Sequence, residues 1–384
     1  MSSVHVPASV RGSADPSAIR LRLRTPGDLL ALVPFLLGFH PRDSLVVVCT
    51  EPGTGTGTRT DKPGRLGLTI RVDLPAAGHL KPLCRQLVRT LRAQRPGGVM
   101  LLVVSDRPGA DPPCRDVVDQ LAEFLAEVSV PVQARVWAAE LVEGARWCCY
   151  DECACSGVLD DPAASPLAAA AVAAGQVTYS DRSAMELLVA PGEQATLGRR
   201  AALLEAAIDA AVLDGELAGV QAAQRDLAAV LSAVGAVGEA QPVLGDEEVV
   251  RLAVALSDPR VRDACLALSV GEQAGAAEQL WTALCREMPD PEAAEPATLL
   301  AVAAIMRGNG GLANVALERA QAAWPGHRLS ALVDAAIQAG THPDSLAVWI
   351  MDAARDARGQ LGLDPEKAPG EPFSRPPGAP DAPA

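Results

Sequence analysis

The residues best suited to chemistry lie in one short polar segment, where His40, Arg42, Asp43 and Ser44 fall within five positions. A nucleophilic serine needs a base within reach and a carboxylate that orients the base, and folds usually bring these groups together from distant parts of a chain. Neighbouring residues cannot all converge on one reacting atom, and the sequence has no Gly-x-Ser-x-Gly element. Two interpretations stay open. One is a ligand-binding turn that also uses Asp73; the other is a structural turn in which Asp43 or Ser44 bonds the backbone and Arg42 pairs with a carboxylate such as Asp73. We favour the structural turn.

A second group consists of four thiols within eight positions, Cys148, Cys149, Cys153 and Cys155. Structural zinc sites take four tetrahedral ligands, usually as two pairs separated by a longer loop. Here all four sulfurs would have to surround one metal ion within a single turn, which is poor geometry for the adjacent pair. The cluster is therefore either a zinc or redox site or a set of free thiols. We favour free thiols and expect no cofactor.

A third group is a basic stripe on a helix predicted at 80–95. Lys81, Arg85, Arg89 and Arg92 recur at helical spacing and share one face. Such a stripe can bind an anion or an acidic partner, or it can be a solvated face that meets an acidic part of the same chain. Residues 1–150 hold 18 Lys and Arg against 14 Asp and Glu, whereas residues 151–384 hold 15 against 33. This asymmetry favours mutual attraction of the two halves.

The element that positions these groups is the segment 25–48. Thr25, followed by proline, predicts a helix N-terminus, with Asp28 in the first turn. Pro34 and Gly38 predict the end of that helix. Residues 45–48 are apolar and β-branched and predict a central strand.

Two runs in this region stand out, PFLLGFHPRDSLVVV at 34–48 and RVDLP at 71–75. Both resemble an actinobacterial family known as domain of unknown function 4192, and a weaker resemblance extends through most of the chain. In that family the mid-chain cysteine region usually ends in Cys-Cys-Pro. The thiols at 148–155 lack this proline, so the resemblance assigns them no role. It implies a fold family and a cytoplasmic bacterial protein, and it implies no activity.

The first part of the chain predicts an α/β domain over 19–160. Helices are expected at 80–95 and 114–128, and residues 136–147 are expected to form a helical or looped crossing. Strands are expected at 19–24, 45–48, 66–74, 99–105 and 131–138. From the second of these strands onward the order is β-β-α-β-α-β, which predicts a mixed sheet with helices packed on it.

The second part predicts an all-α domain over 193–359, joined to the first by a linker with connecting helices at 161–192. Residues 1–18 and 360–384 are expected to be disordered, as is a Gly- and Thr-rich loop at 51–64. The helices are expected at 193–213, 217–233, 246–256, 258–269, 272–287, 296–307, 311–323, 328–339 and 344–358. One tetratricopeptide-like unit is carried by Leu300, Gly308, Ala313, Leu317, Ala320 and Pro325.

Composition excludes several classes of protein. The sequence has no run of about 18 apolar residues that could cross a membrane. A net charge of −14 and only 3% aromatic residues argue against nucleic-acid binding, which depends on phosphate neutralisation and base stacking. Nine cysteines without an export signal indicate reduced thiols. We expect a cytoplasmic protein.

Two functions from different classes remain. The first is an interaction or scaffold protein that binds another protein through its acidic helical domain. The second is an enzyme or ligand-binding protein with a site at the 34–44 turn, which could include the thiols at 148–155. We favour the first, because no set of side chains in the sequence forms a recognisable catalytic arrangement.

Overall fold

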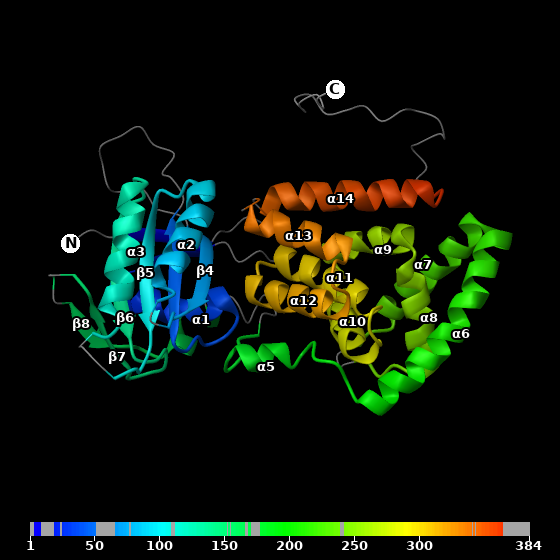
Figure 1. The fold of residues 1–384 in the computed structure, drawn as a ribbon, viewed down its shortest axis with the longest axis horizontal. Coiled ribbons are helices and arrows are strands. Elements are labelled where there is room, and N and C mark those ends of the chain that lie inside the picture. Colours follow the sequence, from blue (N-terminus) through cyan, green and yellow to red (C-terminus); the bar gives the residue numbers. More distant parts are fainter. Residues whose placement is uncertain are drawn as a thin grey trace, which may run out of the picture.

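A computed structural model describes residues 4–8, 19–23, 25–50 and 66–363, apart from 77, 109–111, 152, 154, 166–167, 170–176, 239–241, 340 and 342. A mixed six-stranded sheet with its helices comes first, and a largely helical region follows (Figure 1). The predicted loop at 51–64, residues 166–167 and 170–176 of the predicted linker, and residues 364–384 of the predicted tail lie outside the described residues. No helix within the described ranges is long and apolar enough to span a bilayer.

The sheet has the strand order β4-β3-β5-β6-β7-β8, and only β5 and β6 pair in parallel. Its strands are β3 (Ser44–Thr50), β4 (Leu66–Asp73), β5 (Gly98–Val104), β6 (Val132–Ala138), β7 (Arg146–Cys149) and β8 (Ser156–Val158). With α2 (Leu80–Gln94) and α3 (Arg115–Glu127), the first four strands confirm the predicted β-β-α-β-α-β order. Of the helical or looped crossing expected at 136–147, a loop is present at 139–145; β6 continues to Ala138, and β7 then turns back antiparallel to it. β7 and β8 are too short to show the alternation by which strands are recognised.

Order begins earlier than predicted. β1 (Val4–Ala8) pairs antiparallel with β2 (Ile19–Leu23), with Val4 opposite Leu23. The expectation of disorder throughout 1–18 is therefore wrong for these five residues, whose Val-His-Val alternation matches the strand period. The two strands form a separate ribbon outside the six-stranded sheet.

Helix α1 (Pro26–Leu37) begins as predicted. The Thr25 side chain accepts the Asp28 backbone N–H, and the Asp28 carboxylate accepts the Thr25 N–H, which completes a capping box. The prediction that Pro34 ends the helix is wrong, since Pro34 lies inside it and its carbonyl accepts the N–H of Gly38. The helix ends at Gly38, whose φ of 79° is readily reached only without a side chain.

Two hydrophobic cores lie on opposite faces of the sheet. Alternate residues of β3 and β5 point to each face, and both strands are buried throughout. One core is formed with α2 and α3. The other is continuous from the sheet through α1 into the helical region. The basic stripe of α2 therefore lies on the sheet face turned away from the acidic helices, and the expected attraction between this stripe and the second half is wrong (Figure 1).

The helical region confirms the predicted succession of helices. Its elements are η1 (Pro162–Ala164), α5 (Arg182–Glu186), α6 (Gln194–Ala218), α7 (Val220–Gly235), α8 (Asp246–Ser257), α9 (Pro259–Cys265), η2 (Leu266–Ser269), α10 (Ala274–Glu287), α11 (Ala294–Met306), α12 (Gly310–Ala323), α13 (Arg328–Gln338) and α14 (Pro343–Gln360). The predicted break at 214–216 is wrong: α6 continues to Ala218, and the chain turns at Gly219. The predicted tail also begins too early, since Leu361 is buried.

The sheet and the helices meet at the C-terminal end of α1. Here Tyr179 donates its N–H to the Gly38 carbonyl at 2.8 Å, and His40 donates its N–H to the Tyr179 carbonyl at 3.1 Å. The first turn of α12 approaches the same place so closely that a Cβ on Gly311 would lie 2.2 Å from the Leu37 carbonyl oxygen. No side chain larger than hydrogen fits at Gly311 without separating the two helices.

We predict that Gly311→Ala lowers the free energy of unfolding by about 1–3 kcal/mol, because the added methyl overpacks a rigid backbone contact. Gly310→Ala is the matched control, since a Cβ there meets no atom within 4 Å. Urea unfolding of both variants checks the prediction. Equal stability of the two variants would contradict the close approach of α12 to α1.

Candidate functional site

Asp43 lies at the edge of the sheet where β5 ends. Its Oδ1 accepts a hydrogen bond from the Ser105 hydroxyl at 2.7 Å and pairs with the Arg107 guanidinium at 3.0 Å. Its backbone has a φ of 41°, an uncommon value for a residue other than glycine. Ser105 and Arg107 were not singled out from the sequence. Their position just after an apolar strand could have indicated them, because functional polar groups gather at the carboxyl ends of parallel strands.

Ser44 and Asp73 are joined through Arg71. The Ser44 hydroxyl donates to the Arg42 carbonyl at 2.5 Å, which confirms the backbone bond expected of Asp43 or Ser44. The same hydroxyl accepts from Arg71 Nε at 2.8 Å, and Arg71 pairs with Asp73 at 2.5 Å. The predicted Arg42–Asp73 pair is thus wrong: β3 and β4 are antiparallel neighbours, which places Arg71 beside Ser44 and Asp73.

His40 and Arg42 stand apart from these two groups. The His40 ring is partly buried, and it hydrogen-bonds the Leu141 backbone. Arg42 is exposed, and its charge acts on both His40 and Asp181. The two serine hydroxyls of this edge donate to Asp43 and to a backbone carbonyl, so neither is activated by an imidazole. The turn holds the sheet edge together, and among the described residues it has no nucleophile next to a base.

Three of the four predicted thiols lie together, and the fourth, Cys148, lies apart from them. The Sγ atoms of Cys149, Cys153 and Cys155 all lie within 4.8 Å of one another. Cys148 packs against the α2–α3 core, on the sheet face opposite to the side on which Cys149 packs. Burial, together with the neighbouring thiols of Cys153 and Cys155, raises the pKa of Cys149 to about 12. Hydrogen bonds from Cys155 lower the pKa of Cys153, and both of these thiols are exposed.

The predicted basic stripe borders an open groove between α2 and α3, with a volume of about 850 Å³. Val88, Phe124 and Val128 supply its apolar lining. Arg85, Arg89 and Arg92 lie along it, and Arg95, which the sequence analysis did not select, adds a fourth guanidinium group. Lys81 belongs to the same exposed face and does not line the groove. Among the described residues, none of the four guanidinium groups is paired with a carboxylate.

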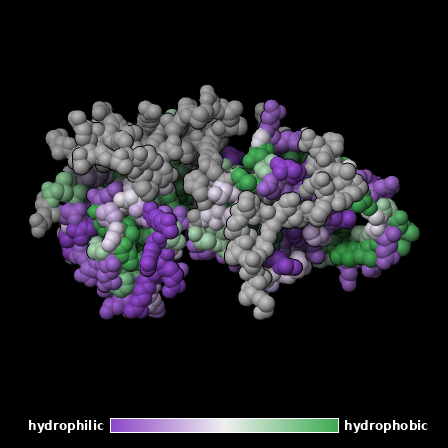
Figure 2. All heavy atoms as spheres, turned by 90° about the horizontal axis from the view of Figure 1, so that it is seen from above, coloured by the Kyte–Doolittle hydropathy of each residue, from purple (hydrophilic) through white to green (hydrophobic). Residues whose placement is uncertain are grey.

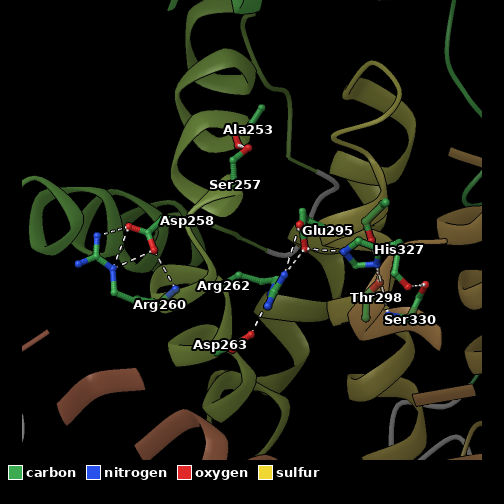
Figure 3. A network of polar contacts seen from close by, with 11 residues as sticks. Ala253, Ser257, Asp258, Arg260, Arg262, Asp263, Glu295, Thr298, His327 and Ser330 are labelled. Carbon is green, nitrogen blue, oxygen red and sulfur yellow. Dashed lines mark hydrogen bonds and ion pairs between the residues drawn. The ribbon is translucent and has the colours of Figure 1, made fainter. Parts of the chain in front are cut away.

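A buried polar network inside the helical region was not found from the sequence (Figure 3). Glu295, only 5% exposed, lies 3.3 Å from Arg262 and 3.2 Å from Nε2 of His327, which is 3% exposed. Because the Ser330 N–H donates to His327 Nδ1, the ring proton lies on Nε2, toward Glu295.

Thr298 also lies beside His327, with its hydroxyl 3.3 Å from Nδ1. A hydroxyl, an imidazole and a carboxylate in this order invite comparison with a catalytic triad. Thr298, however, donates to the Ala294 carbonyl at 2.7 Å and is fully buried. The network joins α9, α11 and α13, and among the described residues the burial of Glu295, Thr298 and His327 leaves no room for a substrate.

The fold and these groups define a class: a two-part α/β and helical protein whose polar clusters at the sheet edge and in the helical core are paired internally. Residues 26–344 match a family described as Domain of unknown function (DUF4192), and the chain belongs to that family. The matched segment begins at the first residue of α1 and includes both the sheet and most of the helices. No curated protein and no solved structure matches the chain.

The burial of His40 predicts a dependence of stability on pH. Burial lowers the pKa of His40 below its ordinary value of 6.5. The hydrogen bond to the Leu141 backbone raises this pKa, and the positive charge of Arg42 lowers it. Between the two pKa values the unfolded chain binds the proton more readily, so stability rises with pH in that window. His40 therefore contributes its full stabilisation above pH 6.5, and the contribution is lost as pH falls through the folded-state value.

Urea unfolding of the wild type and of His40→Asn, from about pH 5 to pH 8, measures this contribution. We expect the difference in stability between the two proteins to shrink toward acid pH. Parallel stability curves across the whole range would contradict the assignment.

Proposed function

We propose that the protein is an interaction module that binds another protein through its helical region. The observation that carries this proposal is the second half of α6. Residues 205–218 form more than three turns of helix in which no side chain is buried. Its apolar residues are exposed, with Leu213 at 56% and Leu217 at 80%. Figure 2 shows hydrophobic surface at the end of the molecule that α6 occupies.

The first half of α6 anchors the helix to the body. Leu197 and Leu204 are buried there, and Arg200 bonds Asp246 on α8 at 2.9 Å. Isolated helices shorter than about 12–15 residues are marginal in water, and the exposed stretch 205–218 is of that length; most helical stability comes from packing an apolar face. Exposed contiguous apolar surface of this kind marks protein–protein contacts. A partner that covered Ile208, Val212 and the two leucines would supply the missing packing.

The charge of α6 indicates the chemistry of that partner. Residues 201–218 include Glu205, Asp209, Asp214 and Glu216 and contain no Lys or Arg. Asp214 already pairs with Arg225 of α7, but a second copy of the same helix would bring Glu205, Asp209 and Glu216 against their counterparts and repel. We therefore infer that the occupant is an amphipathic helix of another protein, with an apolar stripe bordered by Lys or Arg.

A labelled amphipathic peptide of leucine and lysine tests this surface by fluorescence anisotropy. We expect saturable binding to the wild type, and binding weaker by about tenfold or more when Leu213→Glu and Leu217→Glu are combined. Leu332→Glu is the control, because Leu332 is equally exposed on α13, at 67%. A scrambled peptide controls for charge alone.

Equal loss in the control variant, or no saturable binding, would overturn the assignment to α6. Concentration-dependent dimers that the double variant abolishes would assign the surface to a second copy of the chain.

A second binding function is favoured by the groove between α2 and α3. Four guanidinium groups that are unpaired among the described residues surround an apolar floor, and Glu127 is the only acid among the described residues that line the groove. Arginine binds carboxylates through two parallel hydrogen bonds, and the floor can take an apolar side chain. We propose that this groove binds an acidic segment of a partner protein.

A fluorescent peptide of eight glutamates tests the groove. Arg89→Gln combined with Arg92→Gln should weaken binding by about tenfold and flatten its dependence on salt. Arg251→Gln with Arg328→Gln removes the same charge from exposed positions in the helical region and serves as the control. If both double variants weakened binding equally, the effect would come from net charge alone, and the proposal would be overturned. Competition by inorganic pyrophosphate or an oligonucleotide that exceeds the peptide's own affinity would do so too.

The ligand-binding alternative at the 34–44 turn has less support, because Asp43, Ser44 and Asp73 already pair with neighbouring side chains. We also propose that α11 and α12 form one tetratricopeptide-like pair, supported by the burial of Leu300 and Leu317 and by the turn at Gly308. A cytoplasmic, actinobacterial setting is proposed on the resemblance of residues 34–48 and on nine free cysteines.

A further inference from the structure

We infer that Cys149, Cys153 and Cys155 form a binding site for a thiophilic divalent cation of the Zn²⁺ class, with a fourth coordination position open to solvent. The three sulfur atoms are mutually within 4.8 Å. Tetrahedral Zn²⁺ holds thiolates at about 2.3 Å, which places neighbouring sulfurs about 3.8 Å apart. Shifts of an ångström or less therefore separate the observed arrangement from a coordination sphere.

The backbone builds this arrangement. Cys149 is the last residue of β7, and Cys155 directly precedes β8. The Cys149 N–H donates to the Cys155 carbonyl at 2.8 Å, so two ligands are fixed opposite each other at the base of the β7–β8 turn. The Cys155 thiol lies 3.7 Å from the Cys153 carbonyl, which holds the third ligand against the second.

A salt-bridged carboxylate fixes the entrance to the same turn. Asp151 accepts from Arg135 Nε at 2.6 Å, and Arg135 also bonds Asp119 on α3 at 2.9 Å. Asp151 is thereby tied to the body of the sheet and is occupied by a guanidinium group. This leaves sulfur as the ligand of the site, and soft thiolates select Zn²⁺ or Cu⁺ over Mg²⁺ or Ca²⁺.

The number of ligands sets the chemistry. The sequence placed all four cysteines in one cluster, whereas the structure withdraws Cys148 to the opposite sheet face. Binding exchanges three S–H bonds for three Zn–S bonds, and the protons pass to solvent without any change of oxidation state. Cys153 and Cys155 are exposed, so the fourth position faces water, as in sites that keep a position open for a ligand.

The test uses the full chain, reduced and desalted without oxygen. Zn²⁺ is titrated against a chromogenic chelator, and Co²⁺ is added as a spectroscopic probe. We expect one ion per chain and a sulfur-to-cobalt charge-transfer band. Cys153→Ser and Cys155→Ser should each weaken Zn²⁺ binding by about a hundredfold. Both side chains are exposed, so the variants should keep the thermal stability of the wild type.

Cys148→Ser is the matched control, one residue from the site and on the other face of the sheet. It should bind Zn²⁺ like the wild type. Three results would overturn the inference: no metal uptake by the reduced chain, uptake that survives in both Cys153→Ser and Cys155→Ser, or uptake lost equally in Cys148→Ser. A disulfide between two of the three thiols, formed in air by a chain that takes up no metal when reduced, would assign the cluster to redox chemistry instead.

Discussion

The structure depends on α1, a helix in which no residue is exposed. Eight of the residues of α1 are buried, and Leu29, Leu30, Val33 and Leu37 belong to a core that runs from the sheet into the helical region. Each buried leucine or valine stabilises the fold by about 1.5–3 kcal/mol relative to exposure. The sheet can cover only one side of α1, so the helices must cover another. This requirement explains why Tyr179 and the first turn of α12 close on the end of α1. The polar edge around Asp43 and Ser44 follows directly from this junction.

The elements that could be predicted from local sequence are those whose burial follows one regular pattern along the element. β3 and β5 are buried on both faces and read as continuous apolar runs, and the Thr25–Asp28 capping box announces the start of α1. The helices of the second half show the helical period for the same reason. The exceptions have physical causes. Pro34 is tolerated inside α1, where tertiary packing outweighs a lost hydrogen bond, and β7 and β8 pair through their neighbours without any pattern of their own.

The candidate sites also differ in whether local sequence or long-range contacts assemble them. The basic stripe was predictable because it lies on one regular helix, whereas Arg95 joins it only through the groove between α2 and α3. Sequence spacing treated the four cysteines alike, but strand alternation turns adjacent residues to opposite faces and separates Cys148 from Cys149. The Arg71–Ser44 contact and the Glu295–His327 pair could not be found, because each joins residues at least 27 positions apart. The excess of basic residues in the first half and of acidic residues in the second was visible from the sequence, but the faces of the fold that carry these charges were not.

The shared core has a consequence for how this protein can change over time. A two-domain protein with independent cores can exchange, lose or duplicate either part by recombination. Here the residues that complete α1 come from both sides of the linker, so a break at 166–176 would leave apolar surface exposed on each fragment. The matched family segment, which runs from Pro26 through both parts, is consistent with inheritance as one piece. The unit that selection can preserve is therefore the pair of halves together.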